Sequence, residues 1–105
     1  HAAIIVKAGR VLAVGRYRNK THPGSVLDAE GETILKTIHA EFDAISKVKN
    51  KELLKGATIY VARLGRNGHP GMSCPCEMCQ HLISKYGLKK AVYTTEDGTG
   101  IMEFV

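Results

Sequence analysis

Long apolar segments are missing from this sequence. No hydrophobic run approaches the ~20 residues that a membrane-spanning helix requires. The pattern of a secretory signal, a basic start followed by an apolar stretch and small residues, is also absent. Internal repeats and low-complexity segments are lacking as well. We therefore expect a soluble, unexported protein of the cytoplasm.

Cysteine is scarce and confined to one place. The three cysteines all lie between Cys74 and Cys79. Neighbours this close cannot join distant parts of a fold, so the sequence holds no disulfide framework. Their clustering instead favours a metal site in a reducing compartment.

The chain of 105 residues is long enough for one hydrophobic core and too short for two. We expect residues 1–105 to form a single domain. Hydrophobic residues make up 44% and charged residues 24%, which is typical of a globular protein. The net charge of +5 is compatible with an ordinary soluble surface and equally with an anionic partner, such as a phosphate or a nucleic acid.

Apolar and β-branched runs predict five strands. The first two, 2–6 and 11–14, are separated by a short connection with Gly9 and are expected to form a hairpin. Neither alternates polar with apolar residues, which predicts burial on both faces of the sheet. The other strands are expected at 57–62, 89–94 and 101–105, with a turn at 96–98.

Two helices are predicted between these strands. Apolar residues recur at spacings of three and four from residue 34 to residue 48, which predicts one helix over about 37–50. Pro75 suits the first turn of the other helix, which ends at Gly87. Loops are expected at 15–33 and 64–73, and the order is β-β-α-β-α-β-β.

Metal-ligating residues lie in two separated segments, 39–41 and 75–79. Neutral imidazole and thiolate are ligands that zinc takes from proteins, and a catalytic zinc binds three such groups and one water. His39, Cys76 and Cys79 provide this set. Glu41 is placed to remove and redeliver the protons of a bound water.

The spacing of these residues predicts where the site lies. Cys76 and Cys79 are three apart and share the first turn of a helix. His39 and Glu41 are separated by about 200° around an ideal helix, so they cannot share a flank but can share an end. We expect both helices to begin at the metal, where their positive ends favour thiolate ligands.

A structural zinc is the alternative interpretation. Cys74 would then close the site as a fourth ligand, and the protein would be a non-catalytic, zinc-stabilised binding module. Because Cys74 and Cys76 are only two residues apart, they fit poorly as joint ligands at a helix start. We therefore favour Cys74 as a residue of the pocket wall.

With these residues in this order, the chain resembles the cytidine and deoxycytidylate deaminase superfamily. The H-x-E…P-C-x-x-C pattern carries the resemblance, which extends over nearly the whole chain. It implies an α/β fold of the three-layer cytidine deaminase type with a mixed five-stranded sheet. The close turn before the last strand predicts that the final two strands form an antiparallel hairpin.

The resemblance also implies the reaction and its cofactor, Zn²⁺. Glu41 would take a proton from water on the zinc, and the zinc-bound hydroxide would attack C4 of cytosine. Glu41 would then protonate N3 and the departing amine, so that uracil forms and ammonia is released. The expected protein is a hydrolase of nucleotide metabolism.

Substrate contacts are expected around the same site. In the family, an asparagine soon after the second strand contacts the sugar or base, and Asn19 occupies the matching place. Arg18 could meet a phosphate, and Tyr17 is the aromatic residue of the loops that we nominate for contact with the base. The other expected contacts lie in the two motif segments: Ala40, Ser73 and Pro75.

The expected substrate is a free (deoxy)cytidine nucleoside or nucleotide. Single-stranded DNA or RNA, as in nucleic acid editing, is the alternative, because net charge does not separate the two. The loop that reads flanking nucleotides in DNA-acting relatives here contains Glu96 and Asp97 and no aromatic residue. This composition favours the free nucleotide.

Many family members carry a helix before the first strand and another after the fourth. Here the first is absent or trimmed, since the chain begins at His1, and a turn replaces the second. One sheet face is then left uncovered. We expect missing upstream residues or another subunit to cover it, and a homo-oligomer is the simpler expectation.

Overall fold

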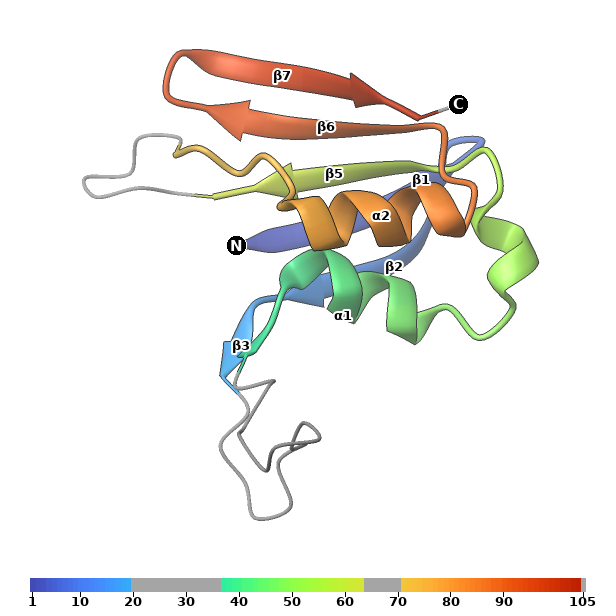
Figure 1. Ribbon diagram of the computed structural model, residues 1–105. Coiled ribbons are helices and arrows are strands. Elements are labelled where there is room, and N and C mark those ends of the chain that lie inside the picture. Colours follow the sequence, from blue (N-terminus) through green and yellow to red (C-terminus); the bar gives the residue numbers. More distant parts are fainter. Residues whose placement is uncertain (20–36, 64–70, 105) are drawn as a thin grey trace.

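The computed structural model describes residues 1–19, 37–63 and 71–104 of the chain. Within these residues, five strands form a mixed sheet in the spatial order β2-β1-β5-β6-β7 (Figure 1). Strands β5 and β6 are parallel, and the other neighbours are antiparallel. The expected α/β class with a mixed five-stranded sheet is confirmed, including the antiparallel final pair. The strands are β1 (Ala2–Lys7), β2 (Arg10–Arg16), β5 (Thr58–Ala62), β6 (Lys90–Thr95) and β7 (Gly98–Glu103).

Two tight turns fix the register of the outer strands. Ala8 and Gly9 join β1 to β2, and both have left-handed backbone angles, with φ of 51° and 76°. Two such residues are typical of a type I′ turn, whose twist matches that of the paired strands. At the other edge, Thr95 pairs directly with Gly98, so the two residues between them make the turn. Both predicted turns are confirmed, although β7 begins three residues earlier than expected.

The helix expected over residues 37–50 is α1, which spans Ala40–Lys47. It begins later than predicted because Thr37–Ile38 forms a short strand, β4, paired with β3 (Arg18–Asn19). This small second sheet was not expected from the sequence. After α1, a 3₁₀ turn, η1 (Lys51–Leu54), leads to β5.

The second helix, α2, spans Glu77–Lys85. Gly87 follows it with a left-handed φ of 80°, as expected for a glycine that ends a helix. Cys76 is the N-cap of α2, so Pro75 precedes the helix. The prediction that Pro75 occupies the first helical turn is therefore wrong. Among the described helices, none has the length and apolar character needed to cross a membrane.

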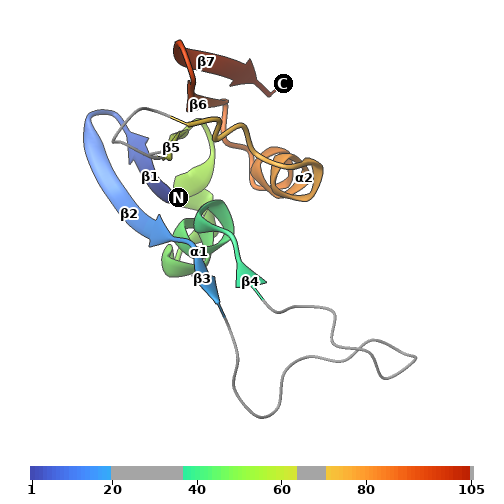
Figure 2. The same cartoon turned by 90° about the vertical axis from the view of Figure 1, so that its left-hand side faces the viewer.

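Both helices lie on one face of the sheet (Figure 2). On that face Ile5 of β1 pairs with Ile59 of β5, and Ile59 pairs with Ala91 of β6. All three are fully buried, and they form the part of the hydrophobic core that the sheet contributes. The helices and the segments that follow them complete it with Ala40, Ala44, Ile45, Val48, Leu54, Ile83 and Leu88.

A row of apolar side chains crosses the opposite face of the sheet. Val14 pairs with Ile4, Ile4 with Tyr60, Tyr60 with Val92, and Val92 with Ile101. Apart from Val92, these side chains are 38–60% exposed. The prediction that the first two strands are buried on both faces is wrong for the described part of the chain. The described residues leave this face of the sheet open.

Gly15 brings α1 close to the sheet. A Cβ atom at this position would lie 2.3 Å from the carbonyl oxygen of Ala40 and 2.3 Å from the backbone nitrogen of Ala44. Only a glycine therefore permits this approach of β2 to the first turns of α1. The contact sets the position of the helix end that carries His39.

Candidate metal centre

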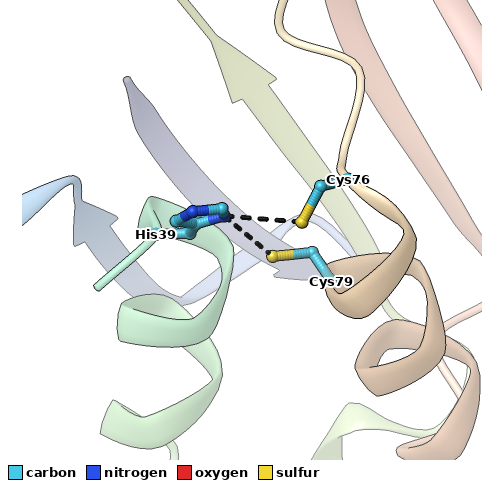
Figure 3. Close-up of side chains that lie close together, drawn as sticks. All are labelled: His39, Cys76 and Cys79. Carbon is cyan, nitrogen blue, oxygen red and sulfur yellow. Dashed lines mark hydrogen bonds between the residues drawn. The ribbon is translucent and has the colours of Figure 1, made fainter. Parts of the chain in front are cut away.

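The two motif segments meet at the starts of the two helices. His39 is the N-cap of α1, and Cys76 is the N-cap of α2. Both have extended backbone angles, and neither side chain caps its own helix. The imidazole and the thiol are therefore free to face each other between the helix ends (Figure 3). This arrangement agrees with the predicted site at two helix starts.

The three expected ligands form one cluster. Nδ1 of His39 lies 3.5 Å from Sγ of Cys76 and 3.5 Å from Sγ of Cys79. All three ligand atoms lie within 4.8 Å of one another. Zn–N and Zn–S bonds of about 2.05 and 2.3 Å at the tetrahedral angle separate nitrogen and sulfur by about 3.6 Å. The donor set and its spacing therefore fit a zinc ion.

Glu41 lies beside the cluster, in the first turn of α1, and is only 5% exposed. Burial, followed by the negative charge of Glu41, raises the pKa of the Cys79 thiol. A bound zinc ion would instead lower the pKa of this thiol, because coordination deprotonates a thiol. The two N-terminal helix ends would add positive potential in the same place.

A cavity of about 200 Å³ opens at the cluster. This is smaller than the ~300–1,000 Å³ of a typical small-molecule pocket, so it suits a single small ring, with the rest of a ligand outside. The ring of Tyr17 lies 6.3 Å from that of His39, measured between centroids. The lining residues are His1, Tyr17, His39, Ala40, Glu41, Ser73, Cys74 and Cys76.

Cys74 lies in the cavity wall and outside the ligand cluster. Among the described residues, the group that could hold a metal comprises His39, Cys76 and Cys79. Cys74 is exposed and lies beside Tyr93, where its negative charge, followed by burial, raises the pKa of the Tyr93 phenol. The expected position in the pocket wall agrees with this placement, and the fourth-ligand alternative gains no support from it.

Some of the predicted substrate-contacting residues line the cavity, and others do not. Ala40 is buried and lines the cavity, as does Ser73, whose hydroxyl bonds to the backbone of the sheet. Pro75 is buried, and its carbonyl accepts a hydrogen bond of 2.8 Å from the Gln80 side chain rather than facing the cavity. The side chains of Arg18 and Asn19 lie outside the described part of the structure, where only their backbone in β3 is placed.

Sequence reasoning missed His1 and Thr94. His1 lines the cavity, and its carbonyl accepts a hydrogen bond of 3.1 Å from the backbone of Tyr17. Thr94 bonds to the segment that precedes the cysteines. Neither residue belongs to a motif, and each reaches the site through contacts between segments that lie apart in the chain, so the sequence alone carried no signal for them.

Comparison with known proteins agrees with this geometry. The sequence model of the cytidine and deoxycytidylate deaminase zinc-binding region matches residues 1–95. A search of curated proteins returned no match.

Two similar solved structures are those of the dCMP deaminase from the cyanophage S-TIM5. The complex with dCMP and dUMP is 28% identical with a TM-score of 0.58, and the alignment covers 88% of this chain and 62% of that one. For the apo form the identity is 29%, the TM-score 0.56, and the coverage 88% and 63%. The present chain therefore spans less than two thirds of the length of these relatives.

Proposed function

Because the chain belongs to the cytidine and deoxycytidylate deaminase family, we propose that it deaminates cytosine to uracil in a free (deoxy)cytidine nucleotide. The observation that carries this proposal is the buried carboxylate of Glu41 in the cavity that opens at the three-ligand cluster. A three-ligand set is the arrangement of catalytic rather than structural zinc.

Each residue of the site has a distinct task in this proposal. His39, Cys76 and Cys79 would hold the metal, which when bound supplies an activated water for hydrolysis. The Glu41 carboxylate would accept a proton from the attacking water and pass it to N3 of the base. It would then accept a second proton, from the hydroxyl group added at C4, and pass it to the departing amine, which leaves as ammonia. Its burial excludes bulk water from these transfers, since the surrounding cavity is small and shielded by both helix starts.

The small cavity supports a single base as the reacting group. The Tyr17 ring, 44% exposed, lies at its edge where a base could stack. A nucleotide is favoured over a nucleoside because the chain carries a net charge of +5 and because the similar cyanophage enzyme was crystallised with dCMP and dUMP. Deoxycytidylate is therefore the first substrate to test.

A panel of three substrates tests the proposal. Zinc content is measured on the purified protein, and uracil formation is followed chromatographically with cytidine, deoxycytidylate and a cytosine-containing single-stranded oligonucleotide. We expect turnover of deoxycytidylate. Turnover of the oligonucleotide alone would replace this proposal with polynucleotide deamination, and zinc binding with no turnover of any substrate would favour a non-catalytic binding module.

We also infer that a second copy of the chain covers the open sheet face. The support is the row of Val14, Ile4, Tyr60, Val92 and Ile101, which is contiguous across strand pairs and, apart from Val92, exposed. Sedimentation of the wild-type protein and of Ile101→Lys tests this. We expect an oligomer that dissociates in the variant, and a monomeric wild-type protein would contradict the inference.

A further inference from the structure

Two hydroxyl groups tie the segment before the cysteines to the sheet. Ser73 is 2% exposed, and its hydroxyl donates a hydrogen bond of 2.8 Å to the carbonyl of Val61 in β5. The same oxygen accepts a bond of 2.8 Å from the backbone N–H of Thr94 in β6. The backbone N–H of Ser73 donates to the carbonyl of Thr94 at 2.9 Å. Ser73 is thus bonded to both parallel strands.

The side chain of Thr94 extends this network. Its hydroxyl lies 2.9 Å from that of Ser73 and donates a bond of 2.7 Å to the carbonyl of Gly71. It also accepts a bond of 3.1 Å from the backbone N–H of Arg63. Gly71 in turn donates its N–H to the carbonyl of Arg63 at 2.8 Å. One threonine therefore joins the end of β5 to the start of the segment that carries the cysteines.

The hydrogen-bond capacity of this pair is used within the protein. Each hydroxyl has one proton, and every acceptor within reach belongs to the protein. For Ser73 the acceptors are the carbonyls of Val61 and Thr94 and the Thr94 hydroxyl; for Thr94 they are the carbonyl of Gly71 and the Ser73 hydroxyl. Neither hydroxyl has a donor left for a ligand in the cavity. The contribution of this pair to the site must therefore be made through the backbone.

The backbone between Ser73 and Cys76 has little freedom to absorb a shift. The ring of Pro75 fixes its own φ angle, and it restricts Cys74 to extended conformations. A displacement of Ser73 is therefore passed to Cys76, the N-cap of α2, and to the cavity wall at Cys74. Metal–ligand distances tolerate changes of only about 0.2 Å, so a small displacement alters the ligand set.

We propose that Thr94 is a positioning residue for the metal centre, holding Ser73 and through it Cys76 at the separation from His39 that zinc requires. The inference rests on the proposed function only in assigning zinc to this cluster, and it concerns metal binding in the absence of substrate. Its test can therefore succeed or fail independently of deamination.

Three variants separate positioning from general stability. Thr94→Val removes the hydroxyl and keeps the shape, and Thr94→Ser keeps the hydroxyl. Thr99→Val is the matched control, because Thr99 is exposed and pairs directly with Thr94 on β7. Zinc affinity is measured by competition with a chelator, the visible absorption spectrum is recorded after cobalt(II) substitution, and thermal unfolding is followed for every variant.

We expect Thr94→Val to bind zinc about tenfold more weakly. Loss of a group that orients a metal ligand typically lowers metal affinity by about 10–100-fold, and this expectation lies at the low end of that range. The cobalt spectrum of Thr94→Val should change in the ligand-field region, whereas Thr94→Ser and Thr99→Val should match the wild type. If Thr94→Val does not fold, Ser73→Ala removes the other hydroxyl of the pair and is expected to give the same loss.

Unchanged zinc affinity and an unchanged cobalt spectrum in Thr94→Val would overturn the inference. So would a loss in Thr94→Ser as large as in Thr94→Val, because packing of the methyl group would then be responsible. Failure of both Thr94→Val and Ser73→Ala to fold would show a general structural role and would also overturn it. A wild-type protein that binds zinc but deaminates nothing would defeat the proposed function and leave this inference standing.

Discussion

His39 and Cys76 occupy the same position in two different helices. Each is the N-cap residue, and Nδ1 of the histidine lies 3.5 Å from Sγ of the cysteine. An N-cap usually carries a side-chain oxygen that bonds to the helix backbone, worth about 0.5–2 kcal/mol. Neither residue makes such a bond. The two helix starts therefore lack this stabilisation and present metal ligands instead.

Replacing Cys76 and replacing Cys74 should have different effects on metal binding. Cys76→Ser removes a thiolate from the ligand cluster, and we expect the purified protein to lose its zinc and to unfold at a lower temperature. Cys74→Ser alters only the cavity wall, so zinc content should stay at that of the wild type. Metal analysis and thermal unfolding measure both effects. Loss of zinc in Cys74→Ser would show that Cys74 is a fourth ligand.

Replacing Glu41 by glutamine should separate metal binding from catalysis. The amide keeps the size of the buried side chain but cannot accept and return protons, so kcat should fall by ~10²–10⁴-fold. Zinc content should not change, because Glu41 is not one of the ligands. Glu103→Gln, which alters an exposed carboxylate on β7, is the control and should retain full activity. Near wild-type turnover of Glu41→Gln would remove Glu41 from the proposed chemistry.

Truncating Tyr17 should weaken substrate binding. Removal of the ring would cost a stacked base ~1–3 kcal/mol of binding free energy. We therefore expect Tyr17→Ala to raise KM about tenfold, whereas the KM of Tyr17→Phe should stay close to that of the wild type. Leu53→Ala is the control, because Leu53 is 45% exposed against 44% for Tyr17 and lies in η1, outside both the cavity lining and the open sheet face. Steady-state kinetics with deoxycytidylate measure the effect. An equal rise of KM in Leu53→Ala would indicate a general loss of structure.

Adding a methyl group at Gly15 should displace α1. The new Cβ would overlap the backbone at Ala40 and Ala44, which cannot move independently of the helix. We expect Gly15→Ala to reduce the free energy of unfolding by about 1–3 kcal/mol and to weaken zinc binding through the displaced His39. Gly71→Ala is the control, since its Cβ would meet only the flexible side chain of Arg63 at 3.3 Å. Equal stability of the two variants would contradict the close approach at Gly15.

Much of the fold was predictable because it depends on local patterns. Strand runs, the turn at Gly9 and the left-handed Gly87 all follow from the preferences of neighbouring residues. The helix boundaries were less accurate. Ile38 belongs to the helical pattern of apolar residues, but residues 37–38 pair with β3 instead. This pairing is a long-range contact that local periodicity does not report.

The burial prediction failed for a different reason. The apolar run that became β1 does not distinguish the two sides of a strand, so it indicated burial on both. In the described structure, Ile5 belongs to the core beneath the helices and is fully buried, whereas its neighbour Ile4 is 38% exposed on the opposite side. Which side is covered depends on where the helices pack, and only the assembled sheet decides it.

The sequence by itself determined the ligand types and their place at helix ends. The two-residue spacing of His39 and Glu41 excludes a shared helix flank, and the three-residue spacing of the two cysteines suits ligands at a single helix start. Tertiary structure decided how the two helix ends meet. The close packing at Gly15 positions the start of α1, and the hydroxyl pair of Ser73 and Thr94 positions the segment before α2. Both contacts join segments that lie far apart in the chain.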